Sequence, residues 1–274
     1  KHTTARAGES AYHASMRRFV TVLSALVPLS GCSADASRGG ADATPPSAPE
    51  GALDPSNPGV WIDGGTFVAG SDDADDEPSS SPYSRRDEDS GRWTVPGFWL
   101  QQHEVTNEEY RRFRPSHTFP PDRARHPVVE ITWSEAMAYA QSLGGTLPTE
   151  VQWEYAARGA EGREYAWGDA PPSCELAHYV ECEPRSTVEA MSRPGDVTPE
   201  GVYDLAGNVR EWVKPTWFDD ERHPVNPDAI RLKGGSWAHL AFFLRAASVT
   251  NYVGVGYSWN NIGFRVAWPE APGR

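Results

Sequence analysis

Residues 201–213 have the sequence GVYDLAGNVREWV, in which an acidic residue stands on each side of a turn. Gly207 and Asn208 form a turn pair at its centre, and the carbonyls of such a pair can point inward. Asp204 and Glu211 are seven residues apart around them. Two carboxylates at this spacing, together with backbone carbonyls that point inward, are the hard oxygen ligands that Ca²⁺ prefers. Two interpretations stay open at this point, a calcium loop or a turn held by side-chain hydrogen bonds without an ion.

The composition around this stretch indicates a globular, loop-rich protein. Its 274 residues include 25 Gly and 24 Pro, with 11 Trp, 10 Tyr and 9 Phe. Turns with large flat side chains between them are expected from such a composition, more than long amphipathic helices. The net charge of −13 argues against nucleic-acid binding, because Lys and Arg must neutralise phosphates there.

The segment before this stretch predicts short elements. Residues 59–71 predict a strand pair with its turn at Gly64-Gly65, and residues 92–105 an alternating strand that ends at Val105. A helix capped by Thr106 or Asn107 follows. An apolar strand and a second helix follow from residue 128, with Thr132 or Ser134 as the cap and Gly144-Gly145 as the stop, and a third helix has Thr149 as its candidate cap. No long helix is indicated beyond the third.

The N-terminal part predicts an export signal. From Met16 the chain has two arginines, an apolar stretch over residues 19–29 and then Leu29-Ser30-Gly31-Cys32. The order is that of a secretory signal, and the apolar stretch is too short for a permanent membrane span. Its end resembles the bacterial lipobox, which implies lipidation of Cys32. The alternative is a coincidental apolar N-terminus with an ordinary cysteine.

The other two cysteines, Cys174 and Cys182, lie close together in CELAHYVEC. In an oxidising envelope compartment such a pair is expected to form a disulfide. A thiolate metal site is the competing interpretation, but two cysteines without C-x-x-C spacing make a poor zinc set.

Several segments in this order resemble the formylglycine-generating enzyme family, also called the sulfatase-modifying factor domain. The motifs that carry the resemblance are GGTFVAGS, FWLQQHEVTNEEY, HPVVEITWSEAMAYAQSLGG, LPTEVQWEYAARG, YAWGD, GVYDLAGNVREWV, LKGGSW and NNIGFRV, which span about residues 59–268. The resemblance implies a single α+β domain, a loop-rich variant of the C-type-lectin-like architecture. It also implies a calcium loop formed by Asp204, Glu211 and the backbone carbonyls of Gly207 and Val209.

The same resemblance implies that the segment after LKGGSW determines which reaction the domain can catalyse. Family members that oxidise a sulfatase cysteine bind copper(I) there through two cysteines, because that soft metal needs thiolates. Here no cysteine occurs after Cys182, and His239 lies near the place of the first of the two. We therefore expect no copper and no formylglycine generation.

Four polar residues remain as groove candidates for catalysis or binding: Ser236, His239, Arg245 and Asn251. The first two, three residues apart, could be a nucleophile and its base, but no orienting carboxylate is visible. The simpler interpretation makes Ser236 a turn residue and His239 a partly exposed loop residue. Trp237, Trp259 and Phe264 are expected to be core anchors, although one of them could line a cleft, and Arg265 is expected to form a structural ion pair.

The sequence thus predicts four parts: a leader and signal peptide (1–31), a lipidated Cys32 with a flexible linker (32–58), the folded domain (59–268) and a short tail (269–274). We expect an exported protein, lipid-anchored to the bacterial cell envelope. Its first expected function is a binding or assembly module that holds a peptide, glycan or envelope protein. The alternatives are an enzyme of the family with altered chemistry and, least expected, an authentic formylglycine-generating enzyme.

Overall fold

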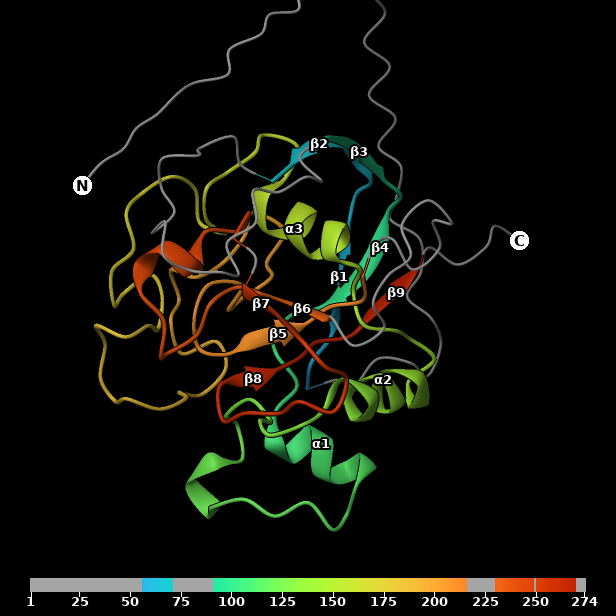
Figure 1. Ribbon diagram of the computed structural model, residues 1–274, viewed down its shortest axis with the longest axis vertical. Helices are drawn as coiled ribbons and strands as arrows, with labels where there is room; N and C mark the ends of the chain where they lie inside the picture. The colour runs from blue at the N-terminus through green and yellow to red at the C-terminus, as the bar shows by residue number, and fades with distance from the viewer. Residues whose placement is uncertain (1–55, 71–90, 216–229, 249, 270–274) are drawn as a thin grey trace, which may run out of the picture. The chain divides into compact units, whose positions relative to one another are not determined.

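Three short capped helices precede a small central sheet in the computed structural model (Figure 1). The structure describes residues 56–70, 91–215, 230–248 and 250–269, except the side chains of residues 250–252. The predicted signal, Cys32, most of the linker and all but the first residue of the tail lie outside these ranges. The folded part begins before residue 59, since Asn57 is buried and bonds to His103.

The three helices begin where the cap residues predict. Helix α1 spans Asn107–Phe113, α2 spans Trp133–Ser142 and α3 spans Glu150–Arg158. Each has a threonine N-cap whose hydroxyl accepts from the N3 amide, while the N3 side chain reaches back to the cap: Thr106, Thr132 and Thr149. This reciprocal bonding satisfies two otherwise orphaned backbone donors per helix and fixes where each helix starts.

The predicted pairing of the first strands is wrong. Strand β1 (Gly59–Ile62) pairs with β4 (Phe98–Gln101), and β2 (Gly65–Ala69) pairs with β3 (Gly91–Val95). Gly64 is required here because a Cβ on it would collide with the backbone at Val95 and Gly97. The glycine pair therefore permits a close crossing of two chain segments and not a hairpin turn.

The single alternating strand predicted to end at Val105 is two strands in the structure. Pro96, which lacks an N–H for the ladder, stands between β3 and β4, and β4 ends at Gln101. Residues 128–131, predicted as a strand, belong to no named strand.

The central sheet has the order β7-β6-β5-β8 and lies between α3 and the α1–α2 pair in Figure 1. Its strands are β5 (Arg210–Trp212), β6 (Ile230–Lys233), β7 (Thr250–Val253) and β8 (Ile262–Gly263). A second sheet, β1-β4-β9, is completed by β9 (Ala267–Pro269). Two 3-10 helices, η1 (Pro121–Arg123) and η3 (Ala241–Leu244), complete the described elements.

Aromatic residues fill the core on both sides of the central sheet. One cluster joins α1, α2 and the C-terminal strands through Tyr110, Tyr139 and Phe264, whose rings contact one another. The other cluster gathers α3 and β2 around Trp153 and Phe67. The prediction of an α+β, loop-rich fold with aromatic anchors is confirmed. No helix within the described ranges has the length and apolar character that a bilayer crossing demands.

Candidate functional site

The turn in GVYDLAGNVREWV has the predicted conformation. Asp204, Gly207 and Asn208 have φ values of 57°, 95° and 50°. Gly207 admits no side chain, because a Cβ would collide with the backbone of His178. Asn208 holds the turn through its side chain, which accepts from Val188 N at 3.0 Å and donates to a carboxylate oxygen of Glu104 at 3.0 Å.

Arg265 lies fully buried at the centre of the domain and forms the ion pair predicted for it. Its Nη2 donates to Glu211 Oε1 at 2.7 Å, and its Nε lies within 3.0 Å of both Glu211 oxygens. The same guanidinium donates to the carbonyls of Gln101 (3.2 Å) and Tyr203 (2.8 Å), and the Nε1 of Trp153 donates to Glu211 Oε2 at 2.9 Å. One cation thereby ties together segments more than 160 residues apart in sequence.

This centre contains more carboxylates than cations. Burial raises the pKa of Glu104 well above its usual value, and the neighbouring Asp204 and Glu211 raise it further. Burial and Asp204 likewise raise the pKa of Asp196, whose Oδ1 has no hydrogen-bond partner. Burial raises the pKa of Asp204 to about 6, although Arg265 opposes this shift. We call Glu104, Asp196, Asp204, Glu211 and Arg265 the buried acidic centre.

The predicted calcium ligands do not fit a calcium ion in this arrangement. Three N–H groups donate to the Glu211 carboxylate, Nε and Nη2 of Arg265 and Nε1 of Trp153, so the Arg265 cation already lies against it where a metal ion would bind. Asp204 accepts from Met191 N, and its side chain is therefore also engaged. Across the residues that the structure covers, no three or more His, Cys, Asp or Glu side chains are grouped to hold a metal ion. Calcium binding stays a prediction, which the experiment on Asp204 in the Discussion tests.

A chain of polar side chains links two of the groove candidates to β5. Ser236 Oγ and His239 Nδ1 are 2.6 Å apart, and Asn261 Nδ2 donates to the same Oγ at 3.0 Å. Arg210 Nη2 in turn donates to Asn261 Oδ1 at 3.1 Å. The backbone N–H of Ala238 also points to Ser236 Oγ, at 3.3 Å.

This chain determines the direction of every proton in it. Arg210 can only donate, so the Asn261 oxygen faces it and the Asn261 amide donates to Ser236. Ser236 Oγ already accepts two bonds, and its hydroxyl proton is therefore directed to His239 Nδ1. The neutral His239 consequently carries its own proton on Nε2, away from Ser236.

Ser236 and His239 differ in their exposure to solvent. Ser236 is 0% exposed, so its hydroxyl cannot reach a substrate, whereas His239 is half-buried on the segment before η3. Burial, followed by the charge of Arg210, lowers the pKa of His239 to about 4. At neutral pH His239 is therefore an uncharged hydrogen-bond donor at the surface.

Other predicted site residues lie elsewhere or have other roles. Arg245 stacks on the Phe242 ring, with Cζ 4.2 Å from the centroid. Asn251 is in β7, and its side chain is outside the described residues. Phe264 is a core anchor as predicted, but Trp259 is 56% exposed, so the prediction of a core role for it is wrong.

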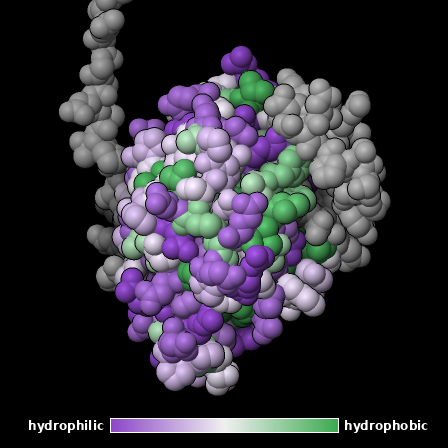
Figure 2. All heavy atoms as spheres, turned by 90° about the vertical axis from the view of Figure 1, so that its left-hand side faces the viewer, coloured by the Kyte–Doolittle hydropathy of each residue, from purple (hydrophilic) through white to green (hydrophobic). Residues whose placement is uncertain are grey.

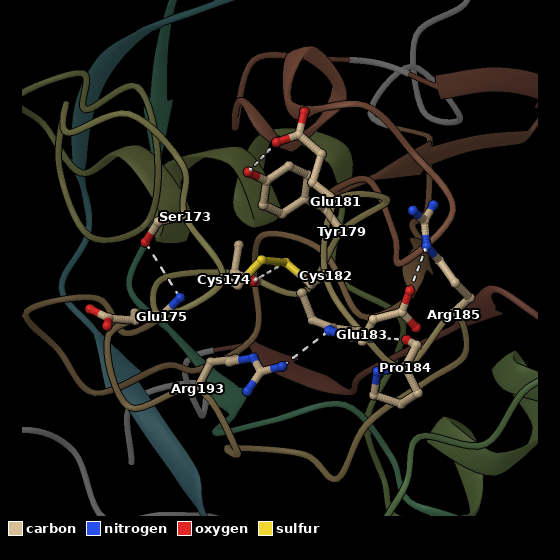
Figure 3. Close-up of a disulfide and its surroundings, with 12 residues drawn as sticks. Ser173, Cys174, Glu175, Tyr179, Glu181, Cys182, Glu183, Pro184, Arg185 and Arg193 are labelled. Carbon is tan, nitrogen blue, oxygen red and sulfur yellow. Dashed lines mark hydrogen bonds and ion pairs between the residues drawn. A yellow bond between two sulfur atoms is a disulfide. The ribbon is translucent and has the colours of Figure 1, made fainter.

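Figure 3 shows the disulfide Cys174–Cys182, which closes a loop that contacts the segment carrying His239. The bridge closes a loop of eight-residue separation, which stabilises a fold by about 2–3 kcal/mol in the chain-entropy model. Val180, inside this loop, donates its N–H to the carbonyl of His239 at 3.0 Å. The disulfide is consistent with an oxidising compartment but does not by itself establish export.

Sequence reasoning missed three residues of this region: Glu104, Arg210 and Asn261. Each is a polar residue next to apolar residues in a motif, HEV, VREW and NNIGF, which is the available signal for a buried polar network. That signal does not identify partners, because Arg210 and Asn261 are 51 residues apart.

Comparison with known proteins agrees with this fold. The family model described as the sulfatase-modifying factor enzyme 1-like domain matches residues 46–270 and so begins inside the predicted linker. The serine/threonine-protein kinase Pkn1 of Chlamydia trachomatis is 32% identical over 227 residues, 69% of this chain and 34% of Pkn1. The formylglycine-generating enzyme of Streptomyces coelicolor is 34% identical over 194 residues, 62% of this chain and 60% of that enzyme.

A third relative, the inactive C-alpha-formylglycine-generating enzyme 2 of mouse, is 33% identical over 154 residues, 52% of this chain and 48% of the relative. This chain thus matches between a third and three fifths of the length of these relatives.

Solved structures share the fold at low sequence identity. PvdO from Pseudomonas aeruginosa superimposes with a TM-score of 0.60 at 22% identity, covering 77% of this chain and 94% of PvdO. CarF gives a TM-score of 0.59 at 21% identity, covering 78% and 98%. These likenesses show the fold, and the family match over residues 46–270 shows that the chain belongs to the sulfatase-modifying factor enzyme 1-like domain family.

Proposed function

We propose that this chain is an exported, lipid-anchored binding module of the cell envelope that holds a peptide, glycan or envelope protein without generating formylglycine. The observation that carries this proposal is the environment of His239. It stands near the position that the family resemblance assigns to a copper-binding thiol, and its Nδ1 is bonded to the buried Ser236. The imidazole presents a hydrogen-bond donor to the surface where a catalytic relative would present a reactive sulfur.

The thiols of the chain support the same proposal. Copper(I) needs soft thiolate ligands, and Cys174 and Cys182 are joined to each other. The third cysteine, Cys32, precedes the domain by a long Ala-, Gly- and Pro-rich segment that serves as a tether in this proposal. One relative is itself named an inactive formylglycine-generating enzyme, so loss of the activity has a precedent within the family.

We expect no aldehyde when the purified chain is incubated with copper(I), oxygen and a peptide that contains Cys-x-Pro-x-Arg. The readout is peptide mass, and the Streptomyces coelicolor formylglycine-generating enzyme serves as the positive control in the same buffer. Aldehyde formed by this chain would overturn the proposal.

A second candidate function, an enzyme of altered chemistry, is favoured by the 2.6 Å contact between Ser236 and His239. A nucleophile and base lie at this distance in covalent catalysis, but Ser236 is closed off from solvent. The same mass assay tests this candidate. A mass change other than aldehyde formation that is lost in His239→Gln would favour the enzyme over the binding module.

We expect a Cys32→Ala variant to leave the membrane fraction of the producing bacterium. Removing the proposed acyl attachment site removes the membrane anchor, since each buried acyl CH₂ contributes about 0.8 kcal/mol to membrane binding. Fractionation and immunoblotting of the two proteins measure the effect, with Cys174→Ala as the control that leaves Cys32 intact. A Cys32→Ala protein that stays membrane-bound would contradict lipidation at Cys32.

A further inference from the structure

Arg210 is a buried cation without a carboxylate partner in the described part of the chain. Its side chain is 4% exposed, its Nη2 donates to Asn261, and its Nε has no partner. Three other buried basic residues each pair with a glutamate, at 2.7–3.1 Å: Arg231, Lys233 and Arg265. A buried charge without an opposite charge is costly, and burial accordingly lowers the pKa of Arg210.

The side chain that contacts Arg210 from the solvent side is Tyr257. Its phenol hydrogen-bonds to the guanidinium, while its side chain is 40% exposed. Tyr257 and the exposed Trp259 belong to the turn between β7 and β8. A ligand oxygen that replaces the phenol oxygen would meet the guanidinium of Arg210.

His239 supplies a second donor next to this cation. Its side chain is joined to Arg210 through Ser236 and Asn261, by successive contacts of 2.6, 3.0 and 3.1 Å. The proton on Nε2 of His239 points away from Ser236 and is available to an acceptor. Figure 2 shows the left-hand side of the view in Figure 1, where hydrophobic patches lie among hydrophilic residues.

We propose that Arg210 and His239, under Tyr257, bind the carboxylate of a ligand, an inference that rests on the proposed binding function and names the chemistry it recognises. The Arg210 guanidinium and the neutral His239 N–H together carry one positive charge. A ligand with one negative charge neutralises it at a site from which water is excluded. The Nε of Arg210 is buried and has no partner, so the ligand must displace the Tyr257 phenol before its planar carboxylate can bind this edge through two parallel hydrogen bonds. A phosphate dianion would leave an uncompensated negative charge.

The test measures thermal unfolding of the whole chain in N-acetylglycine and in its uncharged analogue N-acetylglycinamide, at constant ionic strength and pH 7. We expect N-acetylglycine to raise the melting temperature saturably, because a ligand of the native state stabilises it, and the amide to leave it unchanged. In Arg210→Gln the response should disappear, while the melting temperature without ligand stays equal or rises because an uncompensated charge is gone. Arg231→Gln is the matched control, since it breaks a paired arginine but keeps the response.

Three results would overturn the inference: an equal response to the amide, an equal response to inorganic phosphate, or a response that persists in Arg210→Gln. If Arg210→Gln does not fold, Tyr257→Phe decides. It should move the midpoint concentration of N-acetylglycine at least twofold, and an unchanged midpoint would overturn the inference. If the thermal-unfolding test fails and the mass assay yields no aldehyde, the carboxylate ligand is wrong but the proposed binding module still stands. If the mass assay yields aldehyde, the proposal of a binding module is itself wrong.

Discussion

Replacing Arg265 with Met is expected to lower the free energy of unfolding by about 3–5 kcal/mol, the range for breaking a buried ion pair from one side. The loss leaves Glu211 charged in the interior, and Glu104 and Asp204 lose the cation that opposes their repulsion. Four backbone carbonyls that accept from the guanidinium also lose this donor: those of Gln101, Gln102, Tyr203 and Asp204. Because whole domains are stable by about 5–15 kcal/mol, this single change removes a large share of the total. Urea unfolding measures it.

Two further variants show whether the effect comes from the buried charge. Arg114→Met removes a pair with Glu135 in which Arg114 is 45% exposed, and it should cost less than about 1 kcal/mol. Glu211→Gln in the Arg265→Met background should recover part of the loss, because the amide oxygen still accepts from Trp153 without carrying a charge. A loss in Arg265→Met no greater than in Arg114→Met would show that Arg265 does not hold the buried acidic centre together.

Local features of this fold were predictable from the sequence, and pairings between distant segments were not. The starts of the three helices could be predicted from Thr106, Thr132 and Thr149, because a capping box involves only residues within four positions of one another. The partner of β1 is β4, some 40 residues later, and nothing in either strand encodes the other. Gly64 illustrates this limit. A glycine is required at this position, but it allows two segments of the chain to cross closely and does not form the expected hairpin turn.

The candidate site divides in the same way. Ser236 and His239 could be predicted as a pair because they are three residues apart on one segment. Their proton direction could not, because it depends on Arg210 in β5 and on Asn261 just before β8, which meet only in the fold. Family resemblance located the segment, and the missing thiols followed from counting cysteines. The burial of Ser236, which supports the proposal of a binding module, required the structure.

Replacing Asp204 with Asn is expected to stabilise the protein at pH 7.5 by about 2–3 kcal/mol and to change little at pH 4. Burial raises the pKa of Asp204 from 3.8 to about 6, so the native state holds this proton more tightly than the unfolded chain does. The stability that Asp204 contributes is therefore fully present below pH 3.8 and is lost as the pH rises through 6. A rise of this pKa from 3.8 to about 6 corresponds to about 3 kcal/mol. The asparagine carries no charge at either pH and can still accept from Met191.

The comparison of wild type with Asp204→Asn isolates this carboxyl from groups that act in the opposite direction. Burial lowers the pKa values of four histidines, so the protein loses stability as the pH falls below their unfolded pKa: His117, His126, His178 and His239. These contributions are the same in both proteins and cancel in the difference, and exposed Asp122→Asn serves as a control that should be neutral at both pH values.

Repeating the comparison of wild type with Asp204→Asn in the presence of Ca²⁺ tests whether the turn in residues 201–213 binds the ion. With Glu211 committed to Arg265, added Ca²⁺ should not change the wild-type melting temperature at pH 7.5. If Ca²⁺ instead raises that temperature saturably and Asp204→Asn abolishes the rise, then the ion displaces Arg265 from Glu211. Asp204 would in that case be a calcium ligand, and its substitution would destabilise the protein at neutral pH, opposite in sign to the effect of removing an unpaired buried charge.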